Sequence, residues 1–349
     1  MKLNIDLGNC VKVLSKNSSC TNCADICPVN AINYVENIPQ VLPDCTDCGL
    51  CLGVCPTEAI SLKDFNLLEF VFGFLELKDS TIKCQSNVPC VGTLHVEHLI
   101  SLALLKEQPI SLECCELCHQ ESVKKTKEVN FFLQKLNSHK SINVSLATTP
   151  DIKEEQAGNR RDFLKKFSLK GAIKSKIEFE QEVEAQEIKT PNDQDSANMR
   201  KKELPNKRKL LYMSLKRVGK VEDFEIIEEQ NLSFISQKSI NQDCDNCSIC
   251  YRICPTGALQ SDKRGSKIEF DALSCVKCRL CHDVCEPDAI VLEPFNTKSL
   301  FEPRIEELIK FDVIRCNDCG NFFTYQGGEP TCYRCKLEEE EAKELWGIQ

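Results

Sequence analysis

Segments with helical and strand-like apolar spacing alternate between residues 64 and 150. Apolar positions recur at helical spacing over residues 65–76, 94–105 and 123–136, and at strand spacing over residues 81–84, 109–112 and 142–146. Alternation of this kind predicts a small α/β unit with parallel strands, because a crossover helix returns each strand to the same end of the sheet. His95 and His98 lie one helical turn apart, and the pattern favours a core or surface role for them over metal binding.

Residues 151–209 differ in composition, with 27 charged residues among 59 and no Cys, Trp or Tyr. Such a segment buries little apolar surface, so we expect a charged linker with transient helices. Within it, Arg160-Arg161 beside Phe163 and Leu164 resembles the twin-arginine export box. The motif is internal and no long apolar region follows it. Export is therefore not expected. The plainer interpretation is an amphipathic helix whose Phe163, Leu164 and Phe167 pack on a neighbour; the sharper hypothesis is that residues 159–169 form a helix that docks on a redox-enzyme subunit or its chaperone.

Composition and charge narrow the function classes. The chain has 349 residues, a net charge of −9 and 25 cysteines. The odd cysteine count, the metal-like spacings and the lack of a secretory signal argue against a disulfide scaffold and predict a reducing, cytoplasmic location. The longest apolar stretch, residues 65–77, is too short to span a bilayer, so we expect no membrane insertion. The negative charge disfavours nucleic acid and favours a protein partner with a basic patch.

Three cysteine runs share one metal-binding spacing, and a fourth comes close to it. The complete runs are Cys45-x2-Cys48-x2-Cys51-x3-Cys55, Cys244-x2-Cys247-x2-Cys250-x3-Cys254 and Cys275-x2-Cys278-x2-Cys281-x3-Cys285; the shorter run is Cys20, Cys23 and Cys27. The runs repeat within residues 1–63 and again within 232–295. They resemble bacterial two-cluster ferredoxins, in which three close cysteines bind one [4Fe–4S] cluster. The fourth cysteine binds the other cluster, and we expect a short helix to begin at the proline that follows it.

The resemblance implies four [4Fe–4S] sites in two pairs. The ligand sets are site 1 (Cys27, Cys45, Cys48, Cys51), site 2 (Cys10, Cys20, Cys23, Cys55), site 3 (Cys254, Cys275, Cys278, Cys281) and site 4 (Cys244, Cys247, Cys250, Cys285). Site 2 departs from the pattern because Asn17 occupies the position of its first cysteine. We expect Cys10 to replace it across an inserted loop, residues 11–19, since iron prefers a thiolate. The alternative is that Cys10 is an ordinary thiol and the site holds a three-ligated or three-iron cluster.

Two further cysteine groups have the character of metal ligands. Cys84, Cys90, Cys115 and Cys118 lie near the ends of predicted strands, where α/β sheets gather ligands. Two interpretations stay open for them: a fifth iron–sulfur or zinc site, and a set of buried thiols without a metal, since the ligand spacing is loose. Near the C-terminus, a structural zinc ribbon is predicted by Cys316-x2-Cys319 and Cys332-x2-Cys335. Rubredoxin-like iron is the alternative there, although the second knuckle lacks the proline and glycine usual in rubredoxins.

These patterns predict an α+β protein with two ferredoxin-like modules flanking a small α/β insert. The expected domains are 1–63, the first two-cluster module; 64–150, the cysteine-containing α/β insert; 151–209, the charged linker; 210–295, the second two-cluster module; and 296–349, the zinc ribbon and acidic tail.

The resemblance implies a cytoplasmic polyferredoxin that relays single electrons to or from a redox enzyme. Domain order and the internal Arg160-Arg161 pair also resemble iron–sulfur proteins associated with formate dehydrogenases and related molybdenum enzymes, which implies such a partner. The alternative is a non-catalytic assembly or maturation factor for an iron–sulfur or molybdenum enzyme. No glycine-rich nucleotide motif and no nucleophile constellation occurs, so an electron carrier or redox subunit is favoured over a self-contained enzyme.

Overall fold

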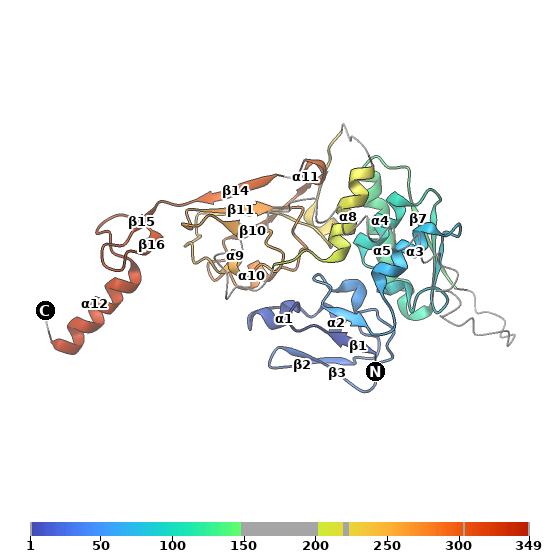
Figure 1. Ribbon diagram of the computed structural model, residues 1–349, viewed down its shortest axis with the longest axis horizontal. Helices are drawn as coiled ribbons and strands as arrows, with labels where there is room; N and C mark the ends of the chain where they lie inside the picture. The colour runs from blue at the N-terminus through green and yellow to red at the C-terminus, as the bar shows by residue number, and fades with distance from the viewer. Residues whose placement is uncertain (1, 148–201, 219–222, 303, 348–349) are drawn as a thin grey trace.

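The computed structural model describes residues 2–147, 202–218, 223–302 and 304–347 (Figure 1). The segment 159–169, for which a docking helix is predicted, lies outside these residues. Within the described ranges, no helix combines the length and the apolar character that a bilayer crossing requires.

The first module, residues 2–63, consists of two antiparallel strand pairs joined by cysteine-containing loops. Strand β1 (Leu3–Ile5) pairs with β4 (Ile60–Leu62), and β2 (Ile32–Val35) forms a hairpin with β3 (Ile38–Val41). Three short helical turns lie in the loops: α1 (Val11–Leu14), α2 (Asn22–Asp25) and the 3-10 turn η1 (Leu52–Val54). Apolar side chains from the strands and from η1 form a small core of their own.

The second module, residues 232–295, repeats this strand pairing. Strand β9 (Gln237–Ile240) pairs with β12 (Ile290–Glu293), and β10 (Leu259–Ser261) pairs with β11 (Lys267–Asp271). Helices α9 (Ile249–Ile253) and α10 (Leu280–Asp283) lie in its cysteine loops. Strand β14 (Ile305–Lys310) extends the β10–β11 pair to three strands. The flanking elements are β8 (Ile226–Ile227), η3 (Glu229–Asn231), β13 (Phe295–Asn296) and α11 (Lys298–Phe301).

The chain forms a turn after each fourth cysteine, so the prediction of a helix beginning at the following proline was wrong. In all four copies the third residue after the cysteine has a positive φ: Asn30 at 49°, Glu58 at 53°, Gly257 at 72° and Asp288 at 50°. A left-handed residue cannot continue a right-handed helix. The short helices instead precede the cysteines, where α2, η1, α9 and α10 end.

The α/β insert has a three-stranded parallel sheet in the order β5-β6-β7, the arrangement that the apolar alternation predicts. Its elements are α3 (Leu67–Glu76), β5 (Thr81–Lys83), η2 (Val91–Thr93), α4 (Val96–Leu105), β6 (Ile110–Cys114), α5 (Glu116–Lys135) and β7 (Ile142–Leu146). Helix α5 begins at Glu116, earlier than its apolar periodicity indicates. His95 and His98 are buried and form a capping box at the start of α4, which confirms their core role.

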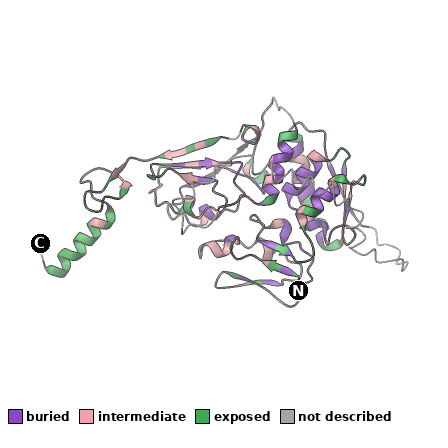
Figure 2. Cartoon of the chain, viewed as in Figure 1, coloured by how far each residue is buried: buried purple, intermediate pink, exposed green. Residues whose placement is uncertain are grey.

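Helix α8 (Asn206–Arg217) begins inside the segment that the sequence assigns to the linker. The Glu58 carboxylate of the first module accepts hydrogen bonds from the backbone nitrogens of Asn206 (2.6 Å) and Lys207 (3.1 Å), and it therefore caps this helix. Helix α8 packs on α4, and buried residues concentrate where these helices meet α5 (Figure 2). The sequence did not predict this helix because its charged residues are typical of a solvated segment. In the fold, however, Lys207 and Arg208 are buried.

The C-terminal part is a hairpin followed by one exposed helix. Strand β15 (Val313–Arg315) pairs with β16 (Phe322–Thr324), and α12 (Tyr333–Trp346) follows without a buried residue. Figure 1 shows α12 at the end of the molecule farthest from the α/β insert. The hairpin contacts the second module where Asn246 Nδ2 donates to Thr324 Oγ1 over 2.9 Å.

Candidate iron–sulfur and metal centres

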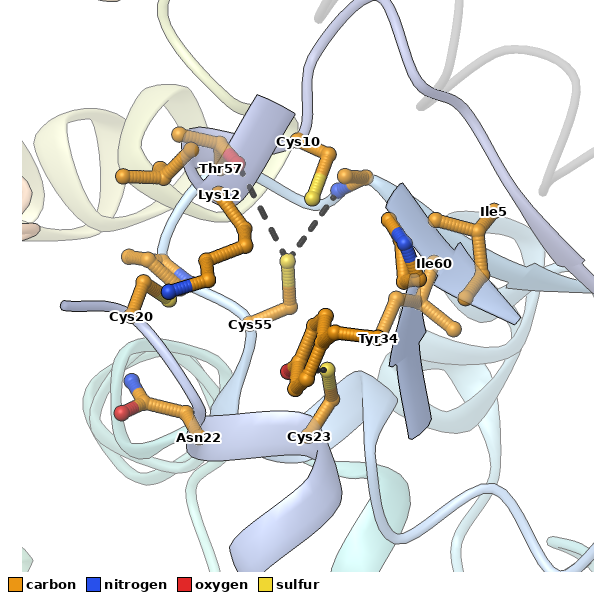
Figure 3. A pocket seen from close by; sticks show the side chains of 14 residues that line it. Ile5, Cys10, Lys12, Cys20, Asn22, Cys23, Tyr34, Cys55, Thr57 and Ile60 are labelled. Atoms are coloured by element: carbon orange, nitrogen blue, oxygen red, sulfur yellow. Dashed lines mark hydrogen bonds between the residues drawn. The ribbon is translucent and has the colours of Figure 1, made fainter. Parts of the chain in front are cut away.

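The four cysteines predicted for site 2 line one hollow in the first module (Figure 3). Cys10 precedes α1, Cys20 and Cys23 flank the start of α2, and Cys55 follows η1. The hollow measures about 360 Å³ and is partly open to solvent. Asn17, at the ordinary ligand position, is exposed and is not among the lining residues. The structure therefore brings Cys10 to the site across the inserted segment; its role as a ligand stays a prediction.

The cysteines predicted for site 1 line a second hollow of about 300 Å³, where Cys27 meets Cys45, Cys48 and Cys51. Thiolates held this close oppose one another's ionisation. At site 2, for example, burial raises the pKa of Cys20 to about 11, with the neighbouring thiolates of Cys55 and Cys23 adding to the shift. A bound cation removes this penalty and releases the protons, so the residues present fit a metal cluster.

In the second module each fourth cysteine lies beside the other run. Burial raises the pKa of Cys278 well above its ordinary value, and the neighbouring Cys254, Cys275 and Cys281 raise it further. Burial also raises the pKa of Cys244, and Asp245 and Cys285 add to the effect. The structure thus gathers Cys254 with the run that begins at Cys275, and Cys285 with the run that begins at Cys244.

Backbone N–H groups donate to the sulfur of the fourth cysteine in three of the four copies. The distances are 3.2 Å from Ala31 N to Cys27 Sγ, 3.3 Å from Ala59 N to Cys55 Sγ and 3.3 Å from Ala289 N to Cys285 Sγ. The left-handed residue before each alanine turns the N–H back over the sulfur. Hydrogen bonds to cluster sulfurs help to set reduction potentials. The alanine four residues after the cysteine is the sequence signal for this contact, which cysteine spacing alone does not reveal.

Hydroxyl groups also contact cysteine sulfurs. Thr57 and Thr256, each two residues after a fourth cysteine, do so at long range, over 3.9 Å to Cys55 and 3.7 Å to Cys254. Two hydroxyls from outside the cysteine motifs lie closer. Tyr34 Oη lies 3.2 Å from Cys23 Sγ at site 2, and Ser236 Oγ lies 3.3 Å from Cys275 Sγ at site 3. A metal-bound thiolate has no proton to donate, so the hydroxyl must be the donor in both contacts when a cluster is bound. Neither residue belongs to a cysteine motif, and sequence reasoning missed both.

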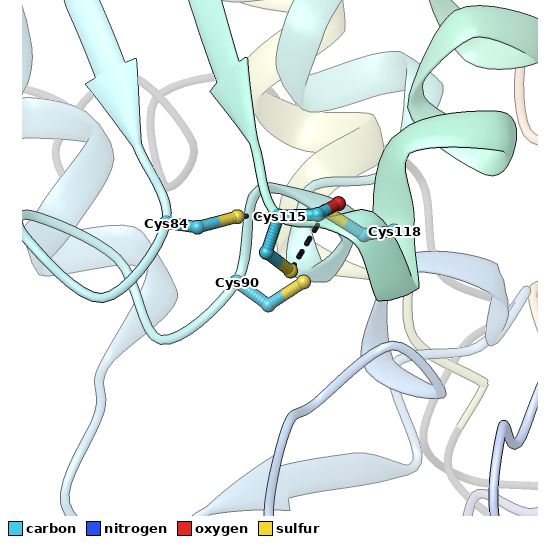
Figure 4. A group of neighbouring side chains, drawn as sticks. All are labelled: Cys84, Cys90, Cys115 and Cys118. Carbon is cyan, nitrogen blue, oxygen red and sulfur yellow. Dashed lines mark hydrogen bonds between the residues drawn. The ribbon is translucent and has the colours of Figure 1, made fainter. Parts of the chain in front are cut away.

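The four extra cysteines of the insert converge at the carboxyl edge of its sheet (Figure 4). Cys84 follows β5, Cys90 precedes η2, and Cys115 and Cys118 lie at the start of α5, directly after β6. Their sulfurs all lie within 4.8 Å of one another, with 3.4 Å between Cys84 and Cys118 and 3.6 Å between Cys115 and Cys118. Hydrogen bonds from the thiols of Cys114, Cys84 and Cys90 hold the pKa of Cys118 far below its ordinary value.

This spacing fits a single metal ion better than a cubane. A tetrahedral ion with metal–sulfur bonds of about 2.3 Å places its four sulfurs about 3.8 Å apart. Cubane thiolates lie farther apart, because iron and inorganic sulfide separate them. Within the described ranges, the cysteines of sites 1 to 4 form no group as tight as the four in the insert. The structure itself therefore separates two kinds of thiolate site.

The second tight group is formed by Cys316, Cys319, Cys332 and Cys335, whose sulfurs also lie within 4.8 Å of one another. The first pair follows β15 and the second pair begins α12. Backbone N–H groups of Cys319 and Cys332 lower the pKa of the Cys316 thiol to about 6. These N–H groups thus stabilise the thiolate form of Cys316, which is the form that binds metal.

A buried lysine lies between the insert site and the first module. Lys125 Nζ donates to the carbonyl oxygens of Gly92 and Leu94, each over 3.0 Å. Burial lowers the pKa of Lys125 to about 8, although Glu121 and the thiolate of Cys90 oppose the shift. A Cβ at Gly53 would lie 1.9 Å from the Gly92 carbonyl oxygen. The loop between Cys51 and Cys55 therefore packs backbone to backbone on the insert, and only glycine fits there.

Two buried basic residues of α8 hold ligand-bearing loops, and sequence reasoning missed them as well. Lys207 Nζ donates to the carbonyl oxygen of Cys55, and Arg208 Nη1 donates to that of Cys275 over 2.7 Å. Arg208 also forms an ion pair with Glu97 of α4. In the sequence these residues are two charges among many, and only the folded arrangement of their partners accounts for their burial.

Two family models match the cysteine runs: a 4Fe-4S dicluster domain over residues 243–289 and a 4Fe-4S binding domain over residues 42–61. No solved structure matches the chain. RNA polymerase subunit Rpo3 of Methanosarcina acetivorans is 36% identical over 61 residues, which are 17% of this chain and 23% of that protein. Pyruvate synthase subunit PorD of Methanocaldococcus jannaschii is 41% identical over 51 residues, which are 14% of this chain and 57% of PorD.

The chain thus covers less than two thirds of these two relatives. It covers more of an uncharacterized ferredoxin of Methanocaldococcus jannaschii, which is 32% identical over 57 residues, or 16% of this chain and 74% of that protein. The shared region, the two matching 4Fe-4S models and the repeated cysteine loops all lead to one conclusion: the chain belongs to the 4Fe-4S ferredoxin family.

Proposed function

We propose that this chain relays single electrons through four [4Fe–4S] clusters, bound at sites 1 to 4. The observation that carries the proposal is the grouping of the cysteines into crossed sets of four, each combining residues from two runs. When bound, each cluster supplies a one-electron redox couple. The chain's own residues supply the thiolates, exclude part of the solvent and donate N–H and O–H hydrogen bonds to the sulfurs. Reversible titration at low potential, with rapid reduction by a physiological donor, tests the proposal.

The two tight thiolate groups are proposed to hold one tetrahedral ion each. Cys316, Cys319, Cys332 and Cys335 favour a structural zinc ribbon, with rubredoxin-like iron as the alternative. The insert site is buried against apolar side chains, and the cationic Lys125 lies nearby to offset part of its thiolate charge. Neither ion needs a redox role for the relay to operate.

Metal content gives the first prediction. Anaerobically reconstituted protein should contain about sixteen irons in cubanes, because four sites hold four irons each. It should also contain two ions in tetrahedral thiolate sites. Metal analysis combined with Mössbauer spectroscopy measures both quantities. As a control, Cys316→Ser with Cys335→Ser should remove one tetrahedral ion and no cubane iron. A total of about twelve irons or fewer in fully reconstituted protein would contradict the four-cluster proposal.

The proposed partner is a redox enzyme or one of its subunits or chaperones. PorD carries the name of a pyruvate synthase subunit, which supports a partner of the redox-enzyme class. The resemblance to proteins associated with formate dehydrogenase makes that enzyme a specific candidate, in a reducing compartment such as the cytoplasm. An assembly or maturation factor remains the second candidate, because the C-terminal hairpin and α12 extend beyond the modules. Capture of partners from anaerobically grown native cells, followed by measurement of electron transfer to each, distinguishes the two roles.

The Tyr34 hydroxyl provides the second prediction. Tyr34→Phe removes the O–H group 3.2 Å from Cys23 Sγ and leaves the ring in place. The hydrogen bond stabilises the more negative, reduced state of the site, so its loss should lower the potential of cluster 2 by tens of millivolts, on the order of 1 kcal/mol for one electron. Spectroscopic redox titration measures the shift. Tyr333→Phe, on exposed α12, is the matched control. An unchanged or raised potential in Tyr34→Phe would contradict the proposed donor role.

A further inference from the structure

A small apolar core joins the two ferredoxin modules at the segment inserted in site 2. Val11 is 2% exposed and packs with Leu280 and Val284 of the second module. Two proposed ligands border this core, Cys20 of site 2 and Cys278 of site 3. Figure 1 shows α1 directly beneath α10. The segment inserted ahead of Cys20 is thus the segment that contacts the other module.

Hydrogen bonds fix the inserted segment to both modules. The backbone nitrogen and the hydroxyl of Ser19 each donate to the Asp283 carboxylate of α10 over 2.8 Å. On the other side, Asn37 Nδ2 donates to the carbonyl oxygen of Lys16 over 2.8 Å, which ties the segment to the β2–β3 hairpin. An inserted loop with partners on both sides serves as a junction, whereas a simple loop would face solvent.

Helix α8 holds the same two sites from a second direction. Its consecutive residues Lys207 and Arg208 donate to the carbonyl oxygens of Cys55, in site 2, and Cys275, in site 3. Both side chains are buried, so their orientation is set by packing and by the ion pair with Glu97. Two independent sets of contacts therefore keep sites 2 and 3 adjacent.

Within each module the paired sites are also adjacent. Cys51 of site 1 and Cys55 of site 2 are buried in the core of the first module, and Cys23 packs against it. In the second module, Cys281 of site 3 and Cys250 of site 4 are buried in one continuous core. Cys247 of site 4 is exposed, in contrast to the buried or half-buried cysteines of the other three sites.

We propose that the inserted segment, residues 11–19, couples the two modules into one line of four clusters in the order 1, 2, 3, 4, with site 2 passing electrons to site 3. The inference rests on the proposed function and adds the route. In the transfer between modules, site 2 is oxidised by one electron and site 3 is reduced by one; no bond forms or breaks. Sites 1 and 4 are the ends of the line, and the exposed Cys247 gives site 4 access to a partner.

The test introduces a charge into the junction. Val11→Glu should retain about sixteen irons, because Val11 is not a ligand. It should lose the magnetic coupling between modules in the fully reduced protein, so that the electron paramagnetic resonance spectrum becomes that of two separate pairs. Freeze-quench spectra after reduction by less than one electron per protein should then show slow redistribution between modules. Val35→Glu, at an exposed valine of the β2–β3 hairpin that lines neither hollow, should match the parent protein.

A milder variant keeps the inference falsifiable if Val11→Glu does not fold. Asp283→Ala removes the acceptor of both Ser19 hydrogen bonds, and we expect it to weaken the same coupling. Unchanged coupling and redistribution in a folded junction variant with full iron would overturn the inferred route. Failure of the proposed function has a different signature, because parent protein without four reducible cubanes would fail before any variant is compared.

Discussion

Replacing Arg208 with leucine is expected to lower the free energy of unfolding by about 3–5 kcal/mol, the cost typical of breaking a buried ion pair from one side. Arg208 is 1% exposed and its partner Glu97 is fully buried. The same guanidinium donates to the carbonyl oxygens of Phe234, Leu273 and Cys275. Leucine fills part of the volume but leaves a carboxylate and these carbonyl groups without their donor, so the variant should unfold at a lower urea concentration.

Two further variants distinguish the effect of a buried ion pair from that of an exposed one. Arg208→Leu combined with Glu97→Leu removes both charges and should recover much of the loss, because an apolar pair can replace a buried ion pair. Arg334→Leu breaks an exposed pair with Glu338 and should leave the midpoint unchanged. Urea unfolding of reconstituted holoprotein, followed by far-ultraviolet circular dichroism, measures all three variants. If Arg208→Leu unfolded at the same urea concentration as the parent protein, the contacts of Arg208 would not stabilise the packing of α8.

Local signals in the sequence predict the cysteine loops well and the contacts between modules poorly. Ligand spacing depends on a few adjacent residues, so the run from Cys45 to Cys55 indicates its own geometry. The parallel sheet of the insert follows in the same way from apolar periodicity. Helix α8 does not, because its burial depends on Glu58 and Glu97, which lie more than a hundred residues earlier in the chain. A segment rich in charged residues is usually exposed, so composition predicts exposure. A charged side chain is buried only where the fold supplies a partner for it, and composition does not show that partner.

Backbone detail is a second limit. The prediction of a helix after each fourth cysteine was wrong because Asn30, Glu58 and Asp288 are left-handed. Asn and Asp adopt this conformation more readily than other non-glycine residues, and it cannot continue a right-handed helix. The predicted start of α5 was wrong for a related reason. Cys115 and Cys118 have the spacing of a metal-binding loop, so the sequence does not indicate that they also lie at the first turn of a helix. The four cysteines form a tight thiolate group because β5 and β6 pair in the fold, a long-range contact that spacing in the sequence does not show.

Loss of Cys10 should damage one cluster and leave three intact. Cys10→Ala leaves site 2 with three thiolates, so one iron of the cubane has no cysteine ligand. The site should then lose its cluster or convert it to a three-iron form, and total iron should fall from about sixteen toward about twelve. Sites 1, 3 and 4 have complete ligand sets without Cys10, so their spectra should not change. Metal analysis and electron paramagnetic resonance of the oxidised protein distinguish an empty site from a three-iron cluster.

Two matched variants make the Cys10 result specific. Asn17→Ala changes the position that the other runs use for the first ligand, and it should leave iron unchanged because Asn17 is exposed. Cys114→Ala removes the one cysteine among 25 that no proposed site uses as a ligand, and it should also retain about sixteen irons. If Cys10→Ala kept the full iron content and the spectra of the parent protein, Cys10 would not be a ligand. Site 2 would then have only three cysteine ligands. Residues 11–19 would then join the modules without having displaced a ligand, and the insertion would serve only the contact with α10.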